Sequence, residues 1–298
     1  MKTLYLHVGL PRCASTLIEN VFFQPLYSPY HRLKAAGIEP LRRLKADLRR
    51  IFAMPTISDE VCQKLYDFHL RPRLNDKNRG FFVSDEALTA FDYLKGAKTV
   101  FADRAQFVGK LTEGFDAKVI LFVRNQVATV ESYYGLSLQN HGTMPFQAFY
   151  DQFPFENLDW LPVADAFASV VGEENIIVLP FERSAYTEKV PFSDFFNALF
   201  QIMGVDNPVS LSEMPVANRS LDPYLFPAQI RVNKELDEKT AKIVHLILYE
   251  TYPKKPGSPM NLLTADQENE LRERFRQSNE TLFDRYMPDF DSSLYLPR

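Results

Sequence analysis

Four short apolar runs, separated by longer segments with helical periodicity, dominate the hydrophobic pattern of the chain. These runs cover residues 4–8, 80–84, 118–123 and 175–179. The helical spacing of apolar side chains is clearest in residues 146–153, 160–171 and 192–203. Short and nearly all-apolar strands that alternate with helices are typical of a parallel sheet covered on both faces. The pattern therefore predicts an α/β fold with a central parallel sheet flanked by helices.

Two segments stand apart from this alternation. The chain has 298 residues and no internal repeat, so we expect one domain over residues 1–298 in which residues 31–78 form a helical insertion or lid. Positions 31–50 carry a basic run, Arg32, Lys34, Arg42, Arg43, Lys45, Arg49 and Arg50. The simpler interpretation of this run is a solvated helical face, and the alternative is a lid that meets an anionic acceptor. Residues 266–286 predict a single amphipathic surface helix.

The first apolar run leads through a turn into a helix. Gly9 and Pro11 end the strand, and Ser15 and Thr16 open the helical segment. Such a turn aims free backbone N–H groups and the positive end of a helix dipole at one point, where an oxyanion binds. The side chain of Arg12 and the two hydroxyls add donors. We expect a nucleotide-phosphate cradle at residues 9–16, with an unspecified phosphate loop or a plain strand–helix turn as alternatives.

The residues that this turn lacks narrow the range of ligands that it can bind. The loop of nucleoside triphosphatases reads G-x-x-x-x-G-K-[ST], and its Lys contacts the β- and γ-phosphates while its last hydroxyl holds Mg²⁺. Here Ala14 follows Gly9 by five positions, and Ser15 stands where the Lys belongs. A triphosphate with bound metal is therefore a poor fit.

A second anion site is predicted at the end of the run 118–123. Arg124 follows the run directly, and Ser132 lies eight positions later on the next predicted helix. An Arg at a strand end is ordinarily a surface residue. Here its guanidinium and the Ser132 hydroxyl can converge on one phosphate, with charge-assisted bonds worth about 1.5–3 kcal/mol each.

Two carboxylates, Asp85 and Glu86, follow the run 80–84. One interpretation is structural, because Ser84 or Asp85 can cap a helix that begins near Glu86. In the functional interpretation this strand end faces the same crevice as residues 9–16, and one carboxylate serves as general base. The residues leave the choice between Asp85 and Glu86 open.

Composition excludes several classes of function. A net charge of −4 provides no basic field for nucleic acid, and no apolar stretch of about 18 residues indicates a membrane span or an export signal. The two cysteines, Cys13 and Cys62, fit a reducing compartment, and the five histidines lie far apart without the spacing of metal ligands. We expect a cytoplasmic protein that has no structural metal and binds small molecules.

Residues 11–16, Pro-Arg-Cys-Ala-Ser-Thr, resemble the 5′-phosphosulfate-binding loop P-K-x-G-[ST]-[ST] of sulfotransferases that use 3′-phosphoadenosine 5′-phosphosulfate (PAPS). Two positions depart from that pattern. Arg12 replaces a Lys and substitutes a planar fork for an ammonium. Ala14 replaces a Gly, which requires either a φ angle that alanine tolerates or some local strain.

The resemblance extends along most of the chain. Arg124 and Ser132 are similar in spacing to the 3′-phosphate motif of the family. Residues 132–134, 146–149, 158–160 and 174–182 follow the running order of bacterial-type carbohydrate sulfotransferases, and residues 217–220, with Arg219, resemble a later segment near the nucleotide. The resemblance is weakest in residues 31–78 and 222–265.

This resemblance implies a P-loop-like sulfotransferase fold and a metal-free transfer of a sulfuryl group from PAPS. The acceptor would be a hydroxyl, less often an amine, of a carbohydrate or glycolipid-like molecule. Glu86 matches the position of the general base, with Asp85 as the alternative, and Arg12 would offset charge on the departing 5′-phosphate. The residues implied in nucleotide binding are Arg12, Cys13, Ala14, Ser15, Thr16, Arg124, Ser132 and Arg219. A small-molecule kinase with a degenerate phosphate loop and an inactive nucleotide-binding protein are the rival hypotheses.

Overall fold

The centre of the structure is a parallel β-sheet. The computed structural model describes residues 1–52, 57–89, 101–190, 194–205, 221–252 and 260–297. Within these residues the sheet has five strands in the order β2-β3-β1-β4-β5, and every pairing is parallel. The strands are β1 (Thr3–Gly9), β2 (Ile38–Pro40), β3 (Gly80–Ser84), β4 (Asp116–Val123) and β5 (Ile176–Pro180). The α/β fold class with a parallel sheet is confirmed.

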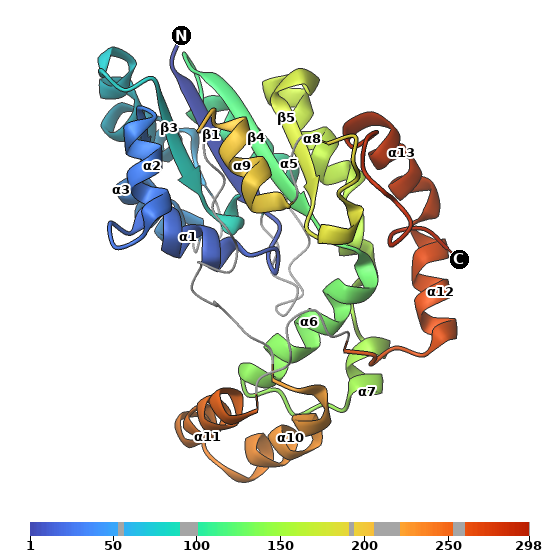
Figure 1. Cartoon of the computed structure of the whole chain (residues 1–298). Helices are drawn as coiled ribbons and strands as arrows, with labels where there is room; N and C mark the ends of the chain where they lie inside the picture. Colours follow the sequence, from blue (N-terminus) through green and yellow to red (C-terminus); the bar gives the residue numbers. More distant parts are fainter. Residues whose placement is uncertain (53–56, 90–100, 191–193, 206–220, 253–259, 298) are drawn as a thin grey trace.

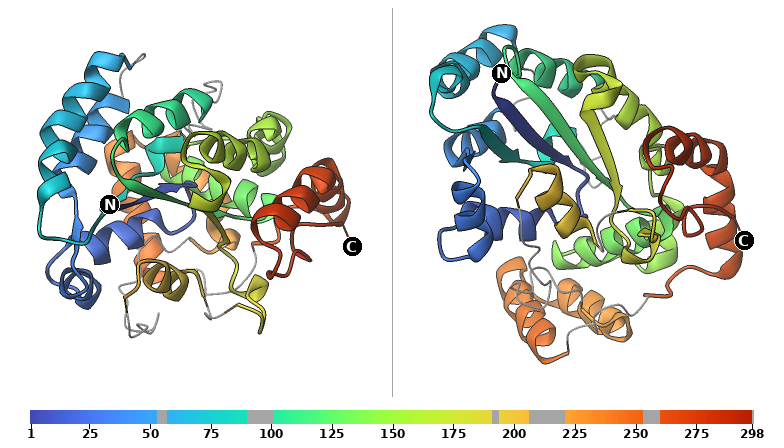
Figure 2. Two further views of the ribbon diagram at one scale, coloured as in Figure 1. Left: turned by 90° about the horizontal axis from the view of Figure 1, so that it is seen from above. Right: turned by 45° about the horizontal axis from the view of Figure 1, so that its top comes forward.

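Helices cover both faces of this sheet, as the two views of Figure 2 show. The helices α1 and α9 lie on one face, and α5 and α8 lie on the other (Figure 1). The α-helices of the described residues are α1 (Ser15–Phe23), α2 (Ser28–Ala35), α3 (Arg42–Phe52), α4 (Asp59–Leu65), α5 (Phe101–Leu111), α6 (Gln126–Gln139), α7 (Phe146–Asp151), α8 (Leu161–Val171), α9 (Phe195–Ile202), α10 (Phe226–Glu235), α11 (Glu238–Thr251), α12 (Ala265–Arg274) and α13 (Arg276–Tyr286).

Shorter helical turns connect several of these elements. They are a π-helix, η1 (Tyr66–Leu70), and the 3₁₀ turns η2 (Arg71–Asn75), η3 (Glu86–Thr89), η4 (Phe155–Leu158), η5 (Glu173–Asn175), η6 (Arg183–Ala185) and η8 (Pro223–Leu225). The turn η3 follows β3 directly and packs against the end of β1. It therefore carries Glu86 at the carboxyl edge of the sheet.

Strand order decides which loops meet. The central strand β1 pairs with β3 on one side and β4 on the other, so that His7 is in register with Ser84 and Gly9 with Leu121. The Leu10 N–H continues the ladder by donating to the Phe122 carbonyl at 2.9 Å. The segments that leave the carboxyl ends of β1, β3 and β4 are therefore neighbours, at the edge where parallel α/β sheets bind ligands.

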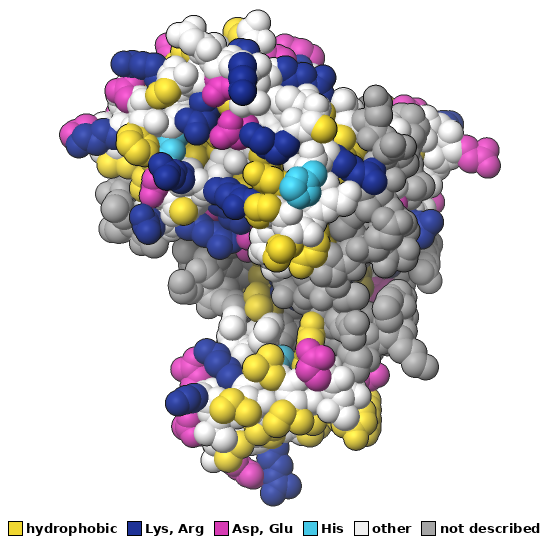
Figure 3. All heavy atoms as spheres, turned by 60° about the vertical axis from the view of Figure 1, so that its left-hand side comes forward, with side chains coloured by type: hydrophobic (Ala, Val, Ile, Leu, Met, Phe, Trp, Pro, Cys, Tyr) yellow, Lys and Arg dark blue, Asp and Glu magenta, His cyan; other side chains and the backbone are white. Residues whose placement is uncertain are grey.

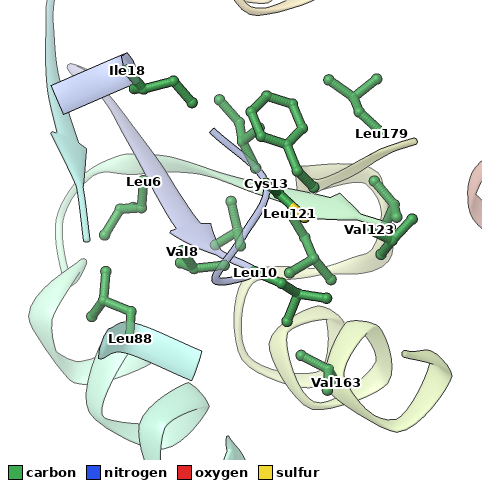
Figure 4. Close-up of a cluster of buried hydrophobic side chains, with 14 of the residues drawn as sticks. Leu6, Val8, Leu10, Cys13, Ile18, Leu88, Leu121, Val123, Val163 and Leu179 are labelled. Carbon is green, nitrogen blue, oxygen red and sulfur yellow. The ribbon is translucent and has the colours of Figure 1, made fainter. Parts of the chain in front are cut away.

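The strands are buried because their side chains enter the core on both faces. Leu6 and Val8 of β1 are fully buried, and Figure 4 shows them in one cluster with Leu121 of β4 and Ile18 of α1. On the α1 face, the ring of Phe22 stacks near aromatic rings of β3 and α9, with centroids 5.2–5.5 Å apart. These contacts fix α1, and with it the turn that precedes the helix.

The structure differs from two expectations of secondary structure. The region 31–78 contributes an edge strand, β2, between α2 and α3, where no strand was expected. The amphipathic segment 266–286 is two helices, because the backbone of Phe275 leaves the helical conformation between α12 and α13. Both helices run along the outer side of the molecule, and α13 packs on α8 (Figure 1).

The helices α10 and α11 pair with each other on the far side of α6, away from the sheet (Figure 1). Among the described residues, no helix combines the length and the apolar character that a membrane crossing needs.

Candidate anion-binding site

The turn between β1 and α1 takes a conformation that opens toward a ligand. Arg12 and Ala14 have positive φ angles of 68° and 60°, which are uncommon for residues with a side chain. Ala14 is the N-cap of α1, its carbonyl accepts the Ile18 N–H at 3.0 Å, and its side chain caps nothing. The amide of Ser15 precedes the first helical hydrogen bond, at the helix end where anions bind.

Cys13 points in the opposite direction. Its side chain is fully buried and belongs to the hydrophobic core, where Figure 4 shows it next to Leu121. Burial raises the pKa of its thiol, so the sulfur stays protonated. Cys13 therefore contributes its backbone to the loop, while its side chain anchors the loop to the core.

The two predicted anion sites adjoin each other. The Arg12 Nε–H donates to Ser132 Oγ at 2.9 Å, and Arg124 Nη1 donates to the carbonyl oxygen of Arg12 at 3.2 Å. Ser132 is buried on α6, whereas the two arginines are partly exposed. Tertiary structure thus joins residues 112 and 120 positions apart in one cluster.

Arg12 and Arg124 form a pair of neighbouring cations in this cluster. Burial, and after it the charge of Arg124, lower the pKa of the Arg12 guanidinium. In the part of the chain that the structure describes, neither Arg12 nor Arg124 forms an ion pair with a carboxylate. The charge of Glu86 acts in the opposite direction and raises the pKa of Arg12. Two guanidinium groups held side by side favour the binding of an anion.

Arg124 is held in place by aromatic residues. Trp160 Nε1 donates to the Arg124 carbonyl at 2.8 Å, and the Arg124 guanidinium lies over the ring of Phe181, 5.3 Å from its centroid. The cation–π contact orients the guanidinium without neutralising it. Phe181 and Trp160 enter the sequence-based prediction only as members of the ranges 174–182, 158–160 and 160–171. Trp160 is buried, but its indole N–H also fixes the end of β4.

A carboxylate supports the start of α6 from behind. Asn125 caps α6 by accepting the Ala128 N–H at 2.9 Å, and its amide nitrogens donate to Glu182 at 2.6 and 2.9 Å. The hydroxyl of Tyr295 donates to the other oxygen of Glu182. These bonds hold the first turn of α6, and therefore the position of Ser132 two turns later.

Glu86 reaches the loop from the neighbouring strand. It begins η3, and its Oε2 accepts a hydrogen bond from Ser15 Oγ. Gly9 permits this approach, because a Cβ on its backbone would lie 3.2 Å from Thr89 Oγ1 and 3.5 Å from the Glu86 Cα. One of the two candidate carboxylates therefore contacts the predicted phosphate loop.

Asp85 has a different environment. Its side chain is 1% exposed, and Oδ1 accepts the Ala87 N–H at 2.9 Å, as a capping residue does. Its Oδ2 faces Arg49 Nε of α3 at 3.6 Å. Burial raises the pKa of Asp85 to about 6. Asp85 thus takes the capping position, and Glu86 lies at the loop.

The basic run of residues 31–50 lies on the face that carries α2 and α3, where Lys and Arg side chains gather (Figure 3). Several of its charges are paired. Lys45 and Arg49 both bind Glu19 of α1, at 2.8 and 2.7 Å, and Arg50 pairs with Asp47 at 3.2 Å.

The remaining predicted residues are placed as follows. Thr16 is the second residue of α1, next to Ser15. Arg219 lies outside the described residues. In the described part of the chain, no group of His, Cys, Asp and Glu side chains is arranged to hold a metal ion.

Comparisons with known proteins find distant similarity. No protein-family model matches the chain. An uncharacterized protein of Archaeoglobus fulgidus is 26% identical over 174 residues, which are 57% of this chain, and the chain spans about half (46%) of that protein's length. The crystal structure of a sulfotransferase from Alicyclobacillus acidocaldarius aligns over 99% of both chains, with 13% identity and a TM-score of 0.48.

Proposed function

We propose that this protein transfers a sulfuryl group from PAPS to a hydroxyl, less often an amine, of a carbohydrate or glycolipid-like acceptor. The observation that carries the proposal is the cation pair of Arg12 and Arg124, which forms no ion pair with a carboxylate of the described residues and lies beside a helix N-terminus. The identity of the nucleotide comes from the motif resemblance, and the convergence of the two arginines supports the proposal that its charges bind here.

The phosphates of the nucleotide match the donors of the cluster. The amides of residues 12–16, with the hydroxyls of Ser15 and Thr16, would hold the 5′-phosphate at the start of α1. Arg124 and Ser132 would hold the 3′-phosphate, with charge-assisted bonds worth about 1.5–3 kcal/mol each. Arg219 is proposed as a further donor from the motif alone.

The bound nucleotide supplies the sulfuryl group, whose bond to the 5′-phosphate oxygen breaks as the acceptor oxygen bonds to sulfur. The chain's own residues then have two tasks. Glu86, in hydrogen-bond contact with Ser15, accepts the proton of the acceptor group, a role worth roughly 10²–10⁴ in rate. Arg12 and the loop amides offset the charge that develops on the departing phosphate.

Isothermal calorimetry tests the nucleotide. We expect adenosine 3′,5′-bisphosphate to bind without metal, and removal of its 3′-phosphate to weaken binding about tenfold or more. Tighter binding of ATP with Mg²⁺ would overturn the proposal in favour of a kinase.

Mass-spectrometric screening tests the transfer. The protein is incubated with PAPS and a panel of hydroxylated and amino sugars and glycolipids, and the expected product is an acceptor heavier by one sulfuryl group. Binding of the bisphosphate without transfer to any member of a broad panel would contradict the enzymatic part of the proposal.

A further inference from the structure

One hydrogen bond crosses the boundary between the two proposed phosphate subsites. Arg12 belongs to the loop that starts α1, the subsite of the 5′-phosphate. Its Nε–H nevertheless donates at 2.9 Å to Ser132 Oγ of α6, the subsite of the 3′-phosphate. In a loop of this kind the residue expected from the motif is Lys, so the contact is a property of the Arg that this chain carries.

The chemistry of the guanidinium explains how one side chain can serve two sites. Its five N–H donors lie in a rigid plane, and Nε occupies one edge while Nη1 and Nη2 form the far end. In the described structure only the Nε edge of Arg12 is hydrogen-bonded, which leaves the four N–H groups of the end for a ligand. A lysine has a single nitrogen and offers no second, separately directed edge.

The backbone of Arg12 strengthens the connection. Its carbonyl oxygen accepts from Arg124 Nη1 at 3.2 Å, so Arg124, Arg12 and Ser132 form one chain of hydrogen bonds. Arg12 holds a positive φ of 68° at this point. Ser132 is buried, so the Arg12 bond also fixes the direction of its hydroxyl.

We infer that Arg12 is a specificity-determining residue for a nucleoside 3′,5′-bisphosphate, because it bridges the two phosphate subsites and holds Ser132 for the 3′-phosphate. This inference rests on the proposed function. Its consequence is that Arg12 and Ser132 act as one unit. The loss of either partner removes the preference for the 3′-phosphate, and the loss of both removes little more.

Calorimetry on a double-mutant cycle tests the bridge. Arg12→Lys, Ser132→Ala and the double variant are titrated with adenosine 3′,5′-bisphosphate and with adenosine 5′-monophosphate. Arg12→Lys keeps the charge, so we expect its affinity for the monophosphate to change less than about threefold, while the bisphosphate binds about tenfold more weakly. The double variant should be within about threefold of the weaker single variant.

Matched controls are Arg50→Lys on α3 and Ser137→Ala on α6, which should leave both affinities unchanged. The inference would be overturned if the affinity losses of the two single variants multiplied in the double variant. It would also be overturned if Arg12→Lys weakened the binding of both nucleotides equally. Failure of the proposed function has a different signature, since the unmodified protein would then not distinguish the two nucleotides.

A second measurement covers the case in which Arg12→Lys does not fold. In protein labelled with ¹⁵N-arginine, the Arg12 Nε–H resonance is assigned as the arginine signal that Ser132→Ala shifts. We expect this signal to remain protected from solvent exchange when the bisphosphate binds, because the bridge persists. Loss of protection on binding would show that the phosphate displaces Arg12 from Ser132, contrary to the inference.

Discussion

Two groups of basic side chains flank the carboxyl end of the sheet, and they differ in what neutralises them. On α3, Lys45 and Arg49 share the carboxylate of Glu19. In the loop cluster, Arg12 and Arg124 bond to a hydroxyl and to a backbone carbonyl. The first group ties α3 to α1. The second forms no ion pair with a carboxylate of the described residues, so its positive charge can attract an anionic ligand.

The comparison teaches that the density of basic residues along a chain does not locate its anion site. The basic run of α3 is conspicuous in the sequence, yet several of its side chains form ion pairs with carboxylates of the protein. Arg12 and Arg124 are isolated in the sequence, and they become a pair because β1 and β4 are neighbours. We therefore expect an anion site where cations converge without forming ion pairs to carboxylates.

The largest effect that the comparison predicts is on catalysis. Glu86→Gln removes the only carboxylate described in contact with the loop, so transfer to an acceptor found by screening should fall about 10²-fold or more. Nucleotide affinity, measured by calorimetry, should stay nearly intact. Glu113→Gln, an exposed acid elsewhere, is the control. Retained activity in Glu86→Gln would pass the role of base to Asp85.

The next effect separates the two basic groups directly. Arg124→Ala should weaken binding of adenosine 3′,5′-bisphosphate by about 1.5–3 kcal/mol, because it removes a charge-assisted donor from the phosphate. Arg49→Ala should change that affinity by less than about threefold, since Arg49 is already paired with Glu19. Calorimetry measures the bisphosphate affinity of both variants. Equal losses of affinity in the two variants would show that the two basic groups do not differ in ligand binding.

The α3 side also predicts a pH dependence through Asp85. Burial raises its pKa from 3.8 to about 6 against the opposing charges of Arg49 and Lys45, with Glu19 adding to the rise. The protonated Asp85 side chain is therefore compatible with the folded state, and with respect to this group the protein keeps its full free energy of unfolding below pH 3.8. Part of that free energy is lost as the pH rises through about 6, because the buried carboxyl group ionises. Asp85→Asn removes this dependence.

Between pH 4 and 7, Asp85→Asn should gain about 1–3 kcal/mol in unfolding free energy relative to the unmodified protein. Urea titrations at a series of pH values measure the difference. His7, whose pKa burial lowers to about 3, titrates in both proteins and cancels. A difference that stays constant with pH would show that Asp85 is charged throughout.

The smallest effect concerns the loop backbone. Ala14→Gly should stabilise the protein by about 1 kcal/mol, since alanine is strained at a φ of 60° and glycine is not. Ala36→Gly is a matched control at a φ of −76°, and it should be neutral or cost up to about 1 kcal/mol. Thermal or urea unfolding measures both. A less stable Ala14→Gly protein would mean that no strain is stored at this position.

The strands whose own residues form an apolar run could be predicted from the sequence. The run 80–84 coincides with β3, and the other three runs match their strands to within two residues. The strand β2 could not be found, because Ile38-Glu39-Pro40 has no strand pattern of its own and forms by pairing with β3 at the sheet edge. The break at Phe275 is likewise invisible in a continuous amphipathic pattern.

Arg12, Arg124 and Glu86 could be named because each closely follows an apolar run, whereas Ser132 came from its spacing on the next helix and Arg219 from the motif resemblance alone. Their contacts could not. The bond from Ser15 to Glu86 and the bond from Arg12 to Ser132 join positions 71 and 120 apart. The supporting contact of Phe181 with Arg124 had no signal in the sequence at all.

By itself, the sequence determined four of the five described strands, the position of the first turn and the residue types that can bind an anion, because these depend on local periodicity and on chemical groups. The tertiary structure decided that β1 lies between β3 and β4, and so which side chains meet. It also decided which cations are neutralised. Strand order and charge pairing arise from packing between distant segments, and no local pattern encodes them.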